Sequence, residues 1–186
     1  MTSYTLFSQE AVPGPTADGS PNTIGVKISV SQACTLGGIW FYSGPGLTGL
    51  PSELALYKVS DQSLVHSEAA MWSPDTPAAG WTFAAFAAAP VLSPAVNYMP
   101  ALLCDTAEFD YISEWWNTGP GSAGIVNGPL SAPGASDGQG WYNAGSALAF
   151  PGSQFNSCNW WLDPQVTPVP AAPSSFSGLP LITGCM

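Results

Sequence analysis

Residues 150–166 read Phe-Pro-Gly-Ser-Gln-Phe-Asn-Ser-Cys-Asn-Trp-Trp-Leu-Asp-Pro-Gln-Val. A Pro-Gly turn comes first, an aromatic and β-prone run with two adjacent tryptophans follows, and the composition then changes abruptly. After Asp163, prolines recur at positions 164, 168, 170 and 173, a pattern typical of an extended linker. The stretch therefore predicts the strand that closes a β-sandwich, with a proline-rich tail behind it.

Further strands are predicted upstream, where apolar residues alternate with a period of two. In residues 23–30 the apolar side chains at 24, 26, 28 and 30 fall on one face, opposite Lys27. Similar patterns predict strands at 35–42, 53–59, 64–67, 81–89, 97–104, 108–116 and 141–142. Residues 117–140 are rich in Gly and Pro and predict a long irregular connection. About eight to ten short strands are typical of an all-β, jelly-roll-like antiparallel β-sandwich.

The charge balance excludes several classes of function. The 186 residues hold 12 acidic residues against Lys27 and Lys58, which gives a formal net charge of −10. Phosphate backbones and anionic membrane surfaces are bound by clustered Lys and Arg, so we expect neither nucleic acid nor membrane as a partner. Charged residues make up only 8% of the chain, which predicts a surface of hydroxyls, amides and backbone, or one covered by partners.

The N-terminus lacks a basic region followed by an apolar run, which predicts that no signal peptide is present. No apolar run of roughly eighteen residues occurs, so no membrane-spanning helix is predicted.

Neither the cysteines nor the histidine form a recognisable reactive motif. Cys34, Cys104, Cys158 and Cys185 include no Cys-x-x-Cys pair, so we expect no zinc site. Three buried thiols and one tail thiol are the favoured interpretation, with a disulfide such as Cys104–Cys158 left open. His66 is interpreted as a surface or edge-strand residue, because no Gly-x-Ser-x-Gly elbow surrounds any serine. We therefore expect no enzymatic activity and no cofactor.

Acidic residues cluster within residues 105–114. On a strand, Glu108, Asp110 and Glu114 share one face. Such a row of carboxylates binds Ca²⁺, forms a catalytic pair, or is simply solvated. A solvated face is the favoured interpretation and calcium ligation the weaker alternative, because the distance between carboxylates is not visible in a sequence.

The chain is rich in aromatic residues, with eight tryptophans and six tyrosines. Aromatic rings beside polar side chains bind sugars, so Trp72, Trp115 and Trp116 are a candidate glycan platform, with Asn127 and Asp137 as polar partners. The favoured alternative is that these tryptophans fill a core poor in long aliphatic residues.

The tail ends in an apolar tip. Phe176, Leu179, Leu181 and Ile182 are candidate docking residues, because a free apolar end in water favours association with a partner. Folding of the tip back onto its own domain is an equal alternative.

Several segments occur in the order found in a known family. These segments are 24–28 (Ile-Gly-Val-Lys-Ile), 38–42 (Gly-Ile-Trp-Phe-Tyr) with the Gly-Pro-Gly and Thr-Gly that follow, 80–81, 127–133, 150–151 and 159–163. Together they resemble the domain-of-unknown-function family 4082, over residues 7–166.

The resemblance implies a jelly-roll fold similar to carbohydrate-binding β-sandwiches, with residues 150–166 as its closing strand and Trp160 or Trp161 directed into the core. It divides the chain into a domain at 1–166 and a tail at 167–186. The family occurs in secreted bacterial surface proteins and in phage virion proteins, and no catalytic residues are established for it. Leu50-Pro51 and residues 102–105 depart from its pattern, so no ligand contacts are carried over there.

Two functions are expected. The first is a structural virion protein of a bacteriophage (a capsid decoration, head-fibre or minor tail subunit), located in the virion, in contact with other virion proteins and homo-oligomeric. The second is a non-enzymatic glycan-binding module for bacterial cell-surface carbohydrate.

Overall fold

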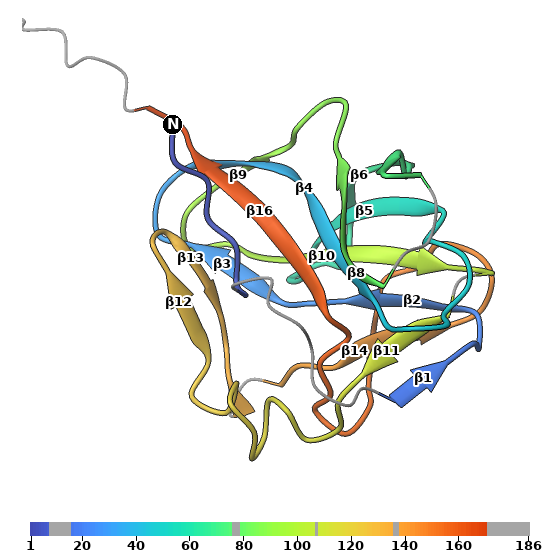
Figure 1. Ribbon diagram of the computed structural model, residues 1–186. Coiled ribbons are helices and arrows are strands. Elements are labelled where there is room, and N and C mark those ends of the chain that lie inside the picture. The colour runs from blue at the N-terminus through green and yellow to red at the C-terminus, as the bar shows by residue number, and fades with distance from the viewer. Residues whose placement is uncertain (8–15, 76–78, 107, 136–137, 171–186) are drawn as a thin grey trace, which may run out of the picture.

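The computed structural model describes residues 1–7, 16–75, 79–106, 108–135 and 138–170, and within them the chain is all-β (Figure 1). The strands are β1 (Thr16–Asp18), β2 (Asn22–Gly25), β3 (Ile28–Val30), β4 (Cys34–Ser43), β5 (Glu53–Lys58), β6 (Leu64–Ala69), β7 (Trp72–Ser73), β8 (Gly80–Ala85), β9 (Val91–Leu92), β10 (Asn97–Cys104), β11 (Phe109–Tyr111), β12 (Ile125–Asn127), β13 (Leu130–Ala132), β14 (Trp141–Ala144), β15 (Ser153–Gln154) and β16 (Leu162–Pro168). Two larger antiparallel sheets enclose the main core, which confirms the predicted β-sandwich, and β1 pairs with β11 in a separate two-stranded sheet. None of the described segments is a helix able to cross a membrane.

The larger sheet is built around β10, the most continuous strand predicted from the sequence. One edge of β10 pairs with β5, and β5 pairs with β6 in the predicted hairpin. The other edge pairs with β2 along its second half and with β3 along its first two residues. Beyond these, β14 pairs with β2, and β13 pairs with β3. The sheet therefore divides into two arms on this side of β10.

The division occurs at a break in the strand predicted over residues 23–30. β2 ends at Gly25 and β3 begins at Ile28, so Val26 and Lys27 lie between them. The buried Gln139 side chain fills the gap: Lys27 N–H donates to its Oε1 over 2.9 Å, and its Nε2 donates to the Lys27 carbonyl over 2.7 Å. A side-chain amide thus makes the two hydrogen bonds that a neighbouring strand would otherwise make.

The smaller sheet is built around β4, which confirms the strand predicted at 35–42. β16 pairs with one edge of β4, while β8 and the short β9 pair with the other. β8 confirms the strand predicted within residues 81–89, although it ends at Ala85. Leu36, Ile39 and Phe41 of β4 are fully buried and belong to the core between the sheets.

The closing strand lies further along the chain than predicted. β16 runs over Leu162–Pro168, while Trp160 and Trp161 precede it and are both buried. Asn159 Oδ1 accepts the Trp161 N–H over 3.0 Å, and Trp161 has φ +53°, so the backbone turns there and cannot yet be extended. β16 also continues through two prolines assigned to the linker, which an edge strand tolerates.

Two other predicted segments are corrected. The strand predicted over 108–116 ends at Tyr111, because Glu114 has φ +59° and its carbonyl accepts the N–H groups of Thr118 and Gly119 in a turn. The irregular connection predicted over 117–140 contains the β12–β13 hairpin. Gly128 begins its two-residue loop with φ +57°, a conformation that glycine adopts without strain.

The N-terminal residues lie against β16 rather than forming a separate strand of either sheet. Tyr4 bridges to Val166, and the backbone N–H groups of Leu6 and Phe7 donate to the two carboxylate oxygens of Asp163 over 2.6 and 3.1 Å. Asp163 is fully buried, so this carboxylate fixes the segment against the end of the core.

Candidate functional site

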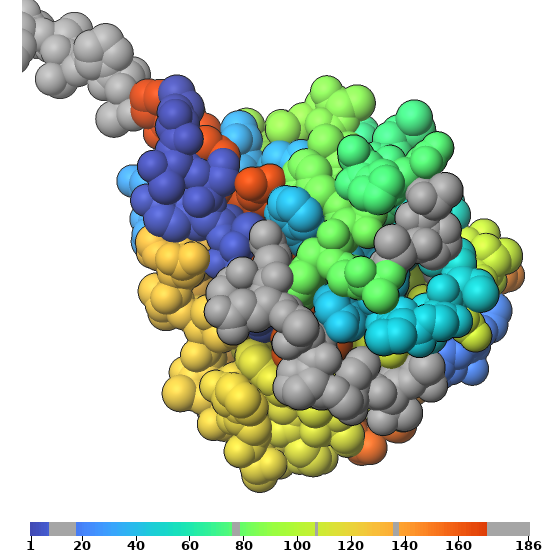
Figure 2. Space-filling model, in the orientation of Figure 1, coloured from blue at the N-terminus to red at the C-terminus, as the bar shows by residue number. Residues whose placement is uncertain are grey.

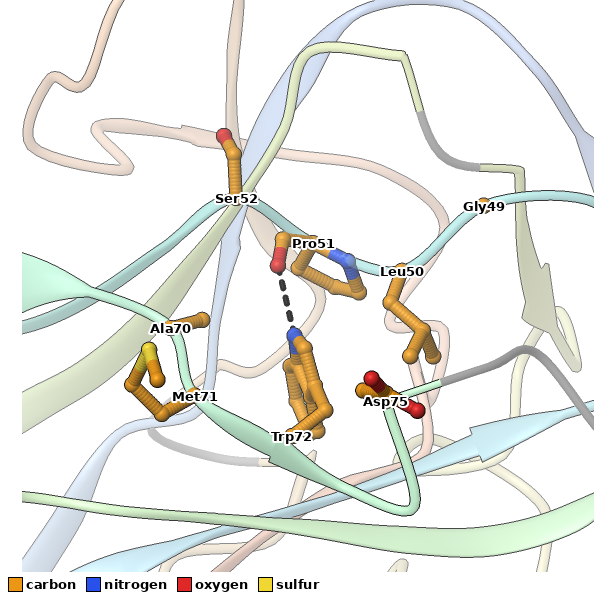
Figure 3. A pocket seen from close by; sticks show the side chains of 8 residues that line it. All are labelled: Gly49, Leu50, Pro51, Ser52, Ala70, Met71, Trp72 and Asp75. Atoms are coloured by element: carbon orange, nitrogen blue, oxygen red, sulfur yellow. Dashed lines mark hydrogen bonds between the residues drawn. The ribbon is translucent and has the colours of Figure 1, made fainter.

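A hollow of about 410 Å³ opens beside Trp72, between the loop that precedes β5 and the end of the β6–β7 connection. Figure 3 shows the Trp72 ring in the middle, with Leu50 and Asp75 on one side and Ala70 and Met71 on the other. Gly49, Pro51 and Ser52 complete the lining. One of the three tryptophans predicted to form a glycan platform therefore borders a surface hollow.

The Trp72 ring is held in a fixed position by two contacts. Its Nε1–H donates to the carbonyl oxygen of Pro51 over 2.6 Å, as the dashed line in Figure 3 marks. The ring also packs on Phe41 of β4, with 5.9 Å between the centroids. Because the indole is anchored at its polar atom and by the core, the part that borders the hollow offers a rigid apolar surface.

The rest of the lining supplies both apolar and polar groups. Met71 is 77% exposed, and Asp75 is also exposed. A hollow with an aromatic ring, a flexible thioether and a carboxylate suits a ligand that has both a C–H face and hydroxyl groups. The sequence pointed to Trp72 through its residue type, but it gave no signal for Met71 or Asp75, whose roles depend on the fold of this loop.

Trp115 and Trp116 do not belong to this site, and the prediction that they are surface sugar-binding rings is corrected. Their side chains are 9% and 1% exposed. Their rings pack on each other with 4.6 Å between centroids, and Phe7 lies edge-on to Trp115 at 5.6 Å. The turn after β11 directs both residues inward, where they fill the end of the core, as the alternative interpretation held.

The two predicted polar partners are not brought to Trp72 either. Asn127 is exposed at the end of β12, and its Nδ2 donates to the Thr5 carbonyl over 3.0 Å. Asp137 lies outside the described residues, as do the candidate docking residues Phe176, Leu179, Leu181 and Ile182.

The three candidate calcium ligands do not share one face, because the strand that would align them ends at Tyr111. Glu108 accepts the backbone N–H of Thr48 over 2.8 Å, and Glu114 is exposed and accepts from Asn117. Asp110 is buried, and this burial raises the pKa of its carboxyl, with a further rise from the charge of Glu108. Among the described residues, no group of three His, Cys, Asp or Glu side chains is arranged to hold a metal ion.

His66 and the described thiols take structural positions. β6 pairs only with β5, so the edge-strand interpretation of His66 is confirmed. His66 Nε2 lies 2.9 Å from Glu68 Oε2. Burial acts to raise the pKa of Glu68, but hydrogen bonds from His66 and from the Ala87 N–H outweigh it and hold that pKa below its usual value.

Cys34, Cys104 and Cys158 are free and buried, as the favoured interpretation predicted, while Cys185 lies outside the described residues. Burial raises the pKa of all three described thiols, which keeps them protonated and unreactive.

A second feature of the molecule is that its N-terminal residues lie beside the last described strand, β16. Tyr4 pairs with Val166, and the Val169 N–H donates to the Ala33 carbonyl over 2.9 Å. Figure 2 shows the N-terminal residues and the end of β16 side by side at one end of the surface. β1, β11 and β14 lie toward the other end (Figure 1).

Comparison with curated proteins found no significant match. The family model described as "Domain of unknown function (DUF4082)" matches residues 10–162. This match covers most of the chain and includes every strand except β16, of which it reaches only the first residue, Leu162. The chain therefore belongs to the DUF4082 family.

Proposed function

We propose that this protein is a non-enzymatic structural protein of a bacteriophage particle, in which the β-sandwich faces outward and a terminal segment anchors it. The observation that carries the proposal is that the N-terminal residues lie beside β16, the last described strand, as the Tyr4–Val166 bridge shows. An anchor that continues from either end leaves the body at the same place. The loops at the opposite end then face away from the particle.

The composition of the chain supports this proposal. Charged residues are depleted in the buried centres of protein interfaces, because each charge must lose its hydration there. A chain with 8% charged residues loses little on packing against neighbouring subunits. Particle proteins repeat by symmetry, so we propose a homo-oligomer in contact with other virion proteins.

The tail provides the test of the anchor. We expect deletion of residues 174–186 to reduce incorporation into purified particles at least about tenfold. The isolated protein should keep its unfolding midpoint, because the last strand of the described residues ends at Pro168. Replacing Leu179, Leu181 and Ile182 together by Ser is the matched control for tail length. It should reproduce the loss if the apolar tip is the anchor. Undiminished incorporation of both variants contradicts the anchor. Absence of the wild-type protein from particles, by mass spectrometry, contradicts the virion role itself.

A second candidate function is binding of bacterial cell-surface glycan, and the hollow at Trp72 favours it. Its rigid ring, its exposed Met71 and its Asp75 carboxylate supply a stacking surface and a hydrogen-bond acceptor within one opening. Neutral sugars need both, since their C–H faces stack on aromatic rings and their hydroxyls bond to polar groups.

We expect Asp75→Asn to weaken binding to the best glycan of a cell-wall polysaccharide array about tenfold, because a carboxylate accepts stronger hydrogen bonds from hydroxyls than an amide does. Trp72→Phe keeps an aromatic ring in place and should weaken binding less. Asp61→Asn is the matched control, an exposed acid at the β5–β6 turn. Equal binding by Asp75→Asn and wild type would exclude this hollow.

A further inference from the structure

A separate hollow of about 270 Å³ lies on the larger sheet, at the edge of the arm that contains β2 and β14. Its lining comes from the turn between β1 and β2, from β14 and from the chain after β15. The lining residues are Asp18, Ser20, Asn22, Tyr142, Ala144, Phe155 and Trp160. It shares no residue with the hollow at Trp72.

One wall of this hollow is aromatic. Phe155 and Trp160 stack with 22° between their planes and 6.3 Å between centroids. Tyr142 and Tyr111 each meet both rings at steep angles. Phe155 is 38% exposed although it is a large apolar residue. Its ring therefore lies at the surface, on top of the aromatic rings that it contacts.

The rest of the lining is largely polar and is held in place by its own hydrogen bonds. Asp18 Oδ1 accepts the Ser20 N–H over 2.8 Å, and Asn22 Nδ2 donates to the Ser20 carbonyl over 2.9 Å. Asn22 is also paired with Ala144 in the sheet, which sets its position relative to Tyr142 two residues earlier on β14. The carboxylate and the amide are therefore fixed in the same lining as the aromatic rings before any ligand arrives.

One lining residue, Trp160, carries a buried donor without a partner among the described residues, which indicates what the ligand supplies. Trp160 is 6% exposed, and its indole Nε1 is buried with no hydrogen-bond partner among the described residues. A buried donor without an acceptor is costly, so a ligand oxygen that reaches it is favoured. Trp40 and Trp161 also have unpaired indole nitrogens, but neither lines this hollow.

We infer that this hollow binds one residue of a neutral saccharide. The aromatic wall takes the C–H face of the sugar, and the Asp18 carboxylate accepts from its hydroxyls. The Trp160 N–H donates to a sugar oxygen. A ligand without an oxygen or other acceptor atom cannot satisfy the Trp160 N–H. An anionic ligand is repelled by Asp18 and by the net charge of −10. The inference goes beyond the site at Trp72, and the two sites can fail separately.

The test is a titration of the full chain with a panel of neutral mono- and disaccharides, followed by ¹H–¹⁵N spectra of the indole groups. The Trp160 signal is assigned as the indole peak absent from Trp160→Phe. We expect that peak to shift on addition of at least one sugar. We expect Phe155→Ala and Asp18→Asn, both at the rim, to weaken the same binding about tenfold or more. Val65→Ala, an exposed apolar residue on β6, should leave it unchanged.

Each result decides between the sites. The inference is overturned if none of the sugars in the panel shifts the Trp160 peak. It is also overturned if sugar binding is unchanged in both rim variants, Phe155→Ala and Asp18→Asn. If Trp160→Phe does not fold, the two rim variants can replace it in the assignment. The indole peak that sugar shifts in the wild type, but in neither rim variant, then belongs to the tryptophan of this hollow. Binding lost in Asp75→Asn but kept in Phe155→Ala would instead place the glycan at Trp72 and overturn this inference alone.

Discussion

Asp163→Ala is expected to lower the free energy of unfolding by about 3 to 5 kcal/mol. The carboxylate accepts the backbone N–H groups of Leu6 and Phe7, and hydrogen bonds to a charged group contribute roughly 1.5 to 3 kcal/mol each. Alanine leaves both N–H groups without this acceptor. Such a loss is a large fraction of the roughly 5 to 15 kcal/mol that stabilises a typical domain.

The packing of the N-terminal segment adds to this effect. Leu6 is buried, and the Phe7 ring lies 5.4 Å from the ring of Trp161 and 5.6 Å from that of Trp115. If the segment detaches, these tryptophans lose their cover, and their fluorescence should shift to longer wavelength before the sheets unfold. Asp163→Asn should cost less than alanine, since its amide oxygen still accepts one of the two hydrogen bonds.

Urea denaturation, monitored by tryptophan fluorescence, gives the free energy of unfolding of each variant and so tests this prediction. Asp75→Ala is the matched control, because it removes an exposed carboxylate with no effect on the core. A free energy of unfolding for Asp163→Ala within about 1 kcal/mol of wild type would show that the N-terminal segment contributes little to the stability of the sandwich.

The strands that the sequence predicted well are those whose pairing follows from their own pattern. β10 has the predicted bounds, and the β5–β6 hairpin joins two alternating runs across a short turn. The closing strand was displaced because an aromatic run suits both a strand and a buried turn. Only the hydrogen bond from the Trp161 N–H to the Asn159 side chain decides between these.

The candidate site was predicted less well, because a tryptophan has the same sequence signal whether it fills a core or borders a hollow. Trp115 and Trp116 are buried because Phe7, more than a hundred residues away, packs against them. Phe155 and Tyr142 come together through the β14–β15 pairing, which spans two short strands with little pattern of their own. Local sequence carries no information on either contact.

The break in the strand predicted over 23–30 is an error of the same kind, and it leads to the second large effect. The apolar period runs through Val26 and Lys27 without interruption, so the pattern predicts one strand. The residue that divides it is Gln139, which is 112 positions from Lys27 and fully buried. Its Nε2 also lies 3.4 Å from the carbonyl oxygen of Pro133, the residue after β13. One amide therefore links Lys27, at the break between β2 and β3, to the chain after β13.

Gln139→Glu is expected to lower the free energy of unfolding by about 3 to 5 kcal/mol at pH 7, although it changes one atom. The new oxygen replaces a donor and faces the carbonyl oxygens of Lys27 and Pro133. Burial beside two carbonyls favours the protonated carboxyl, so its pKa in the folded state lies above the unfolded value of about 4.3. The folded state then holds more protons than the unfolded state between these two pKa values, and stability falls as the pH rises through that window.

Urea denaturation at pH 3.5, 5 and 7 separates this effect from a simple loss of packing. At pH 3.5 the protonated carboxyl can again donate one hydrogen bond, so the variant should approach wild type, and the difference should grow toward pH 7. Leucine has neither donor nor acceptor and does not titrate. Gln139→Leu should therefore lower the free energy of unfolding by the same amount at all three pH values. Gln62→Glu makes the same chemical change at an exposed turn and should shift little at any pH. A pH-independent difference between Gln139→Glu and wild type would mean that the amide donor does not hold the two arms together.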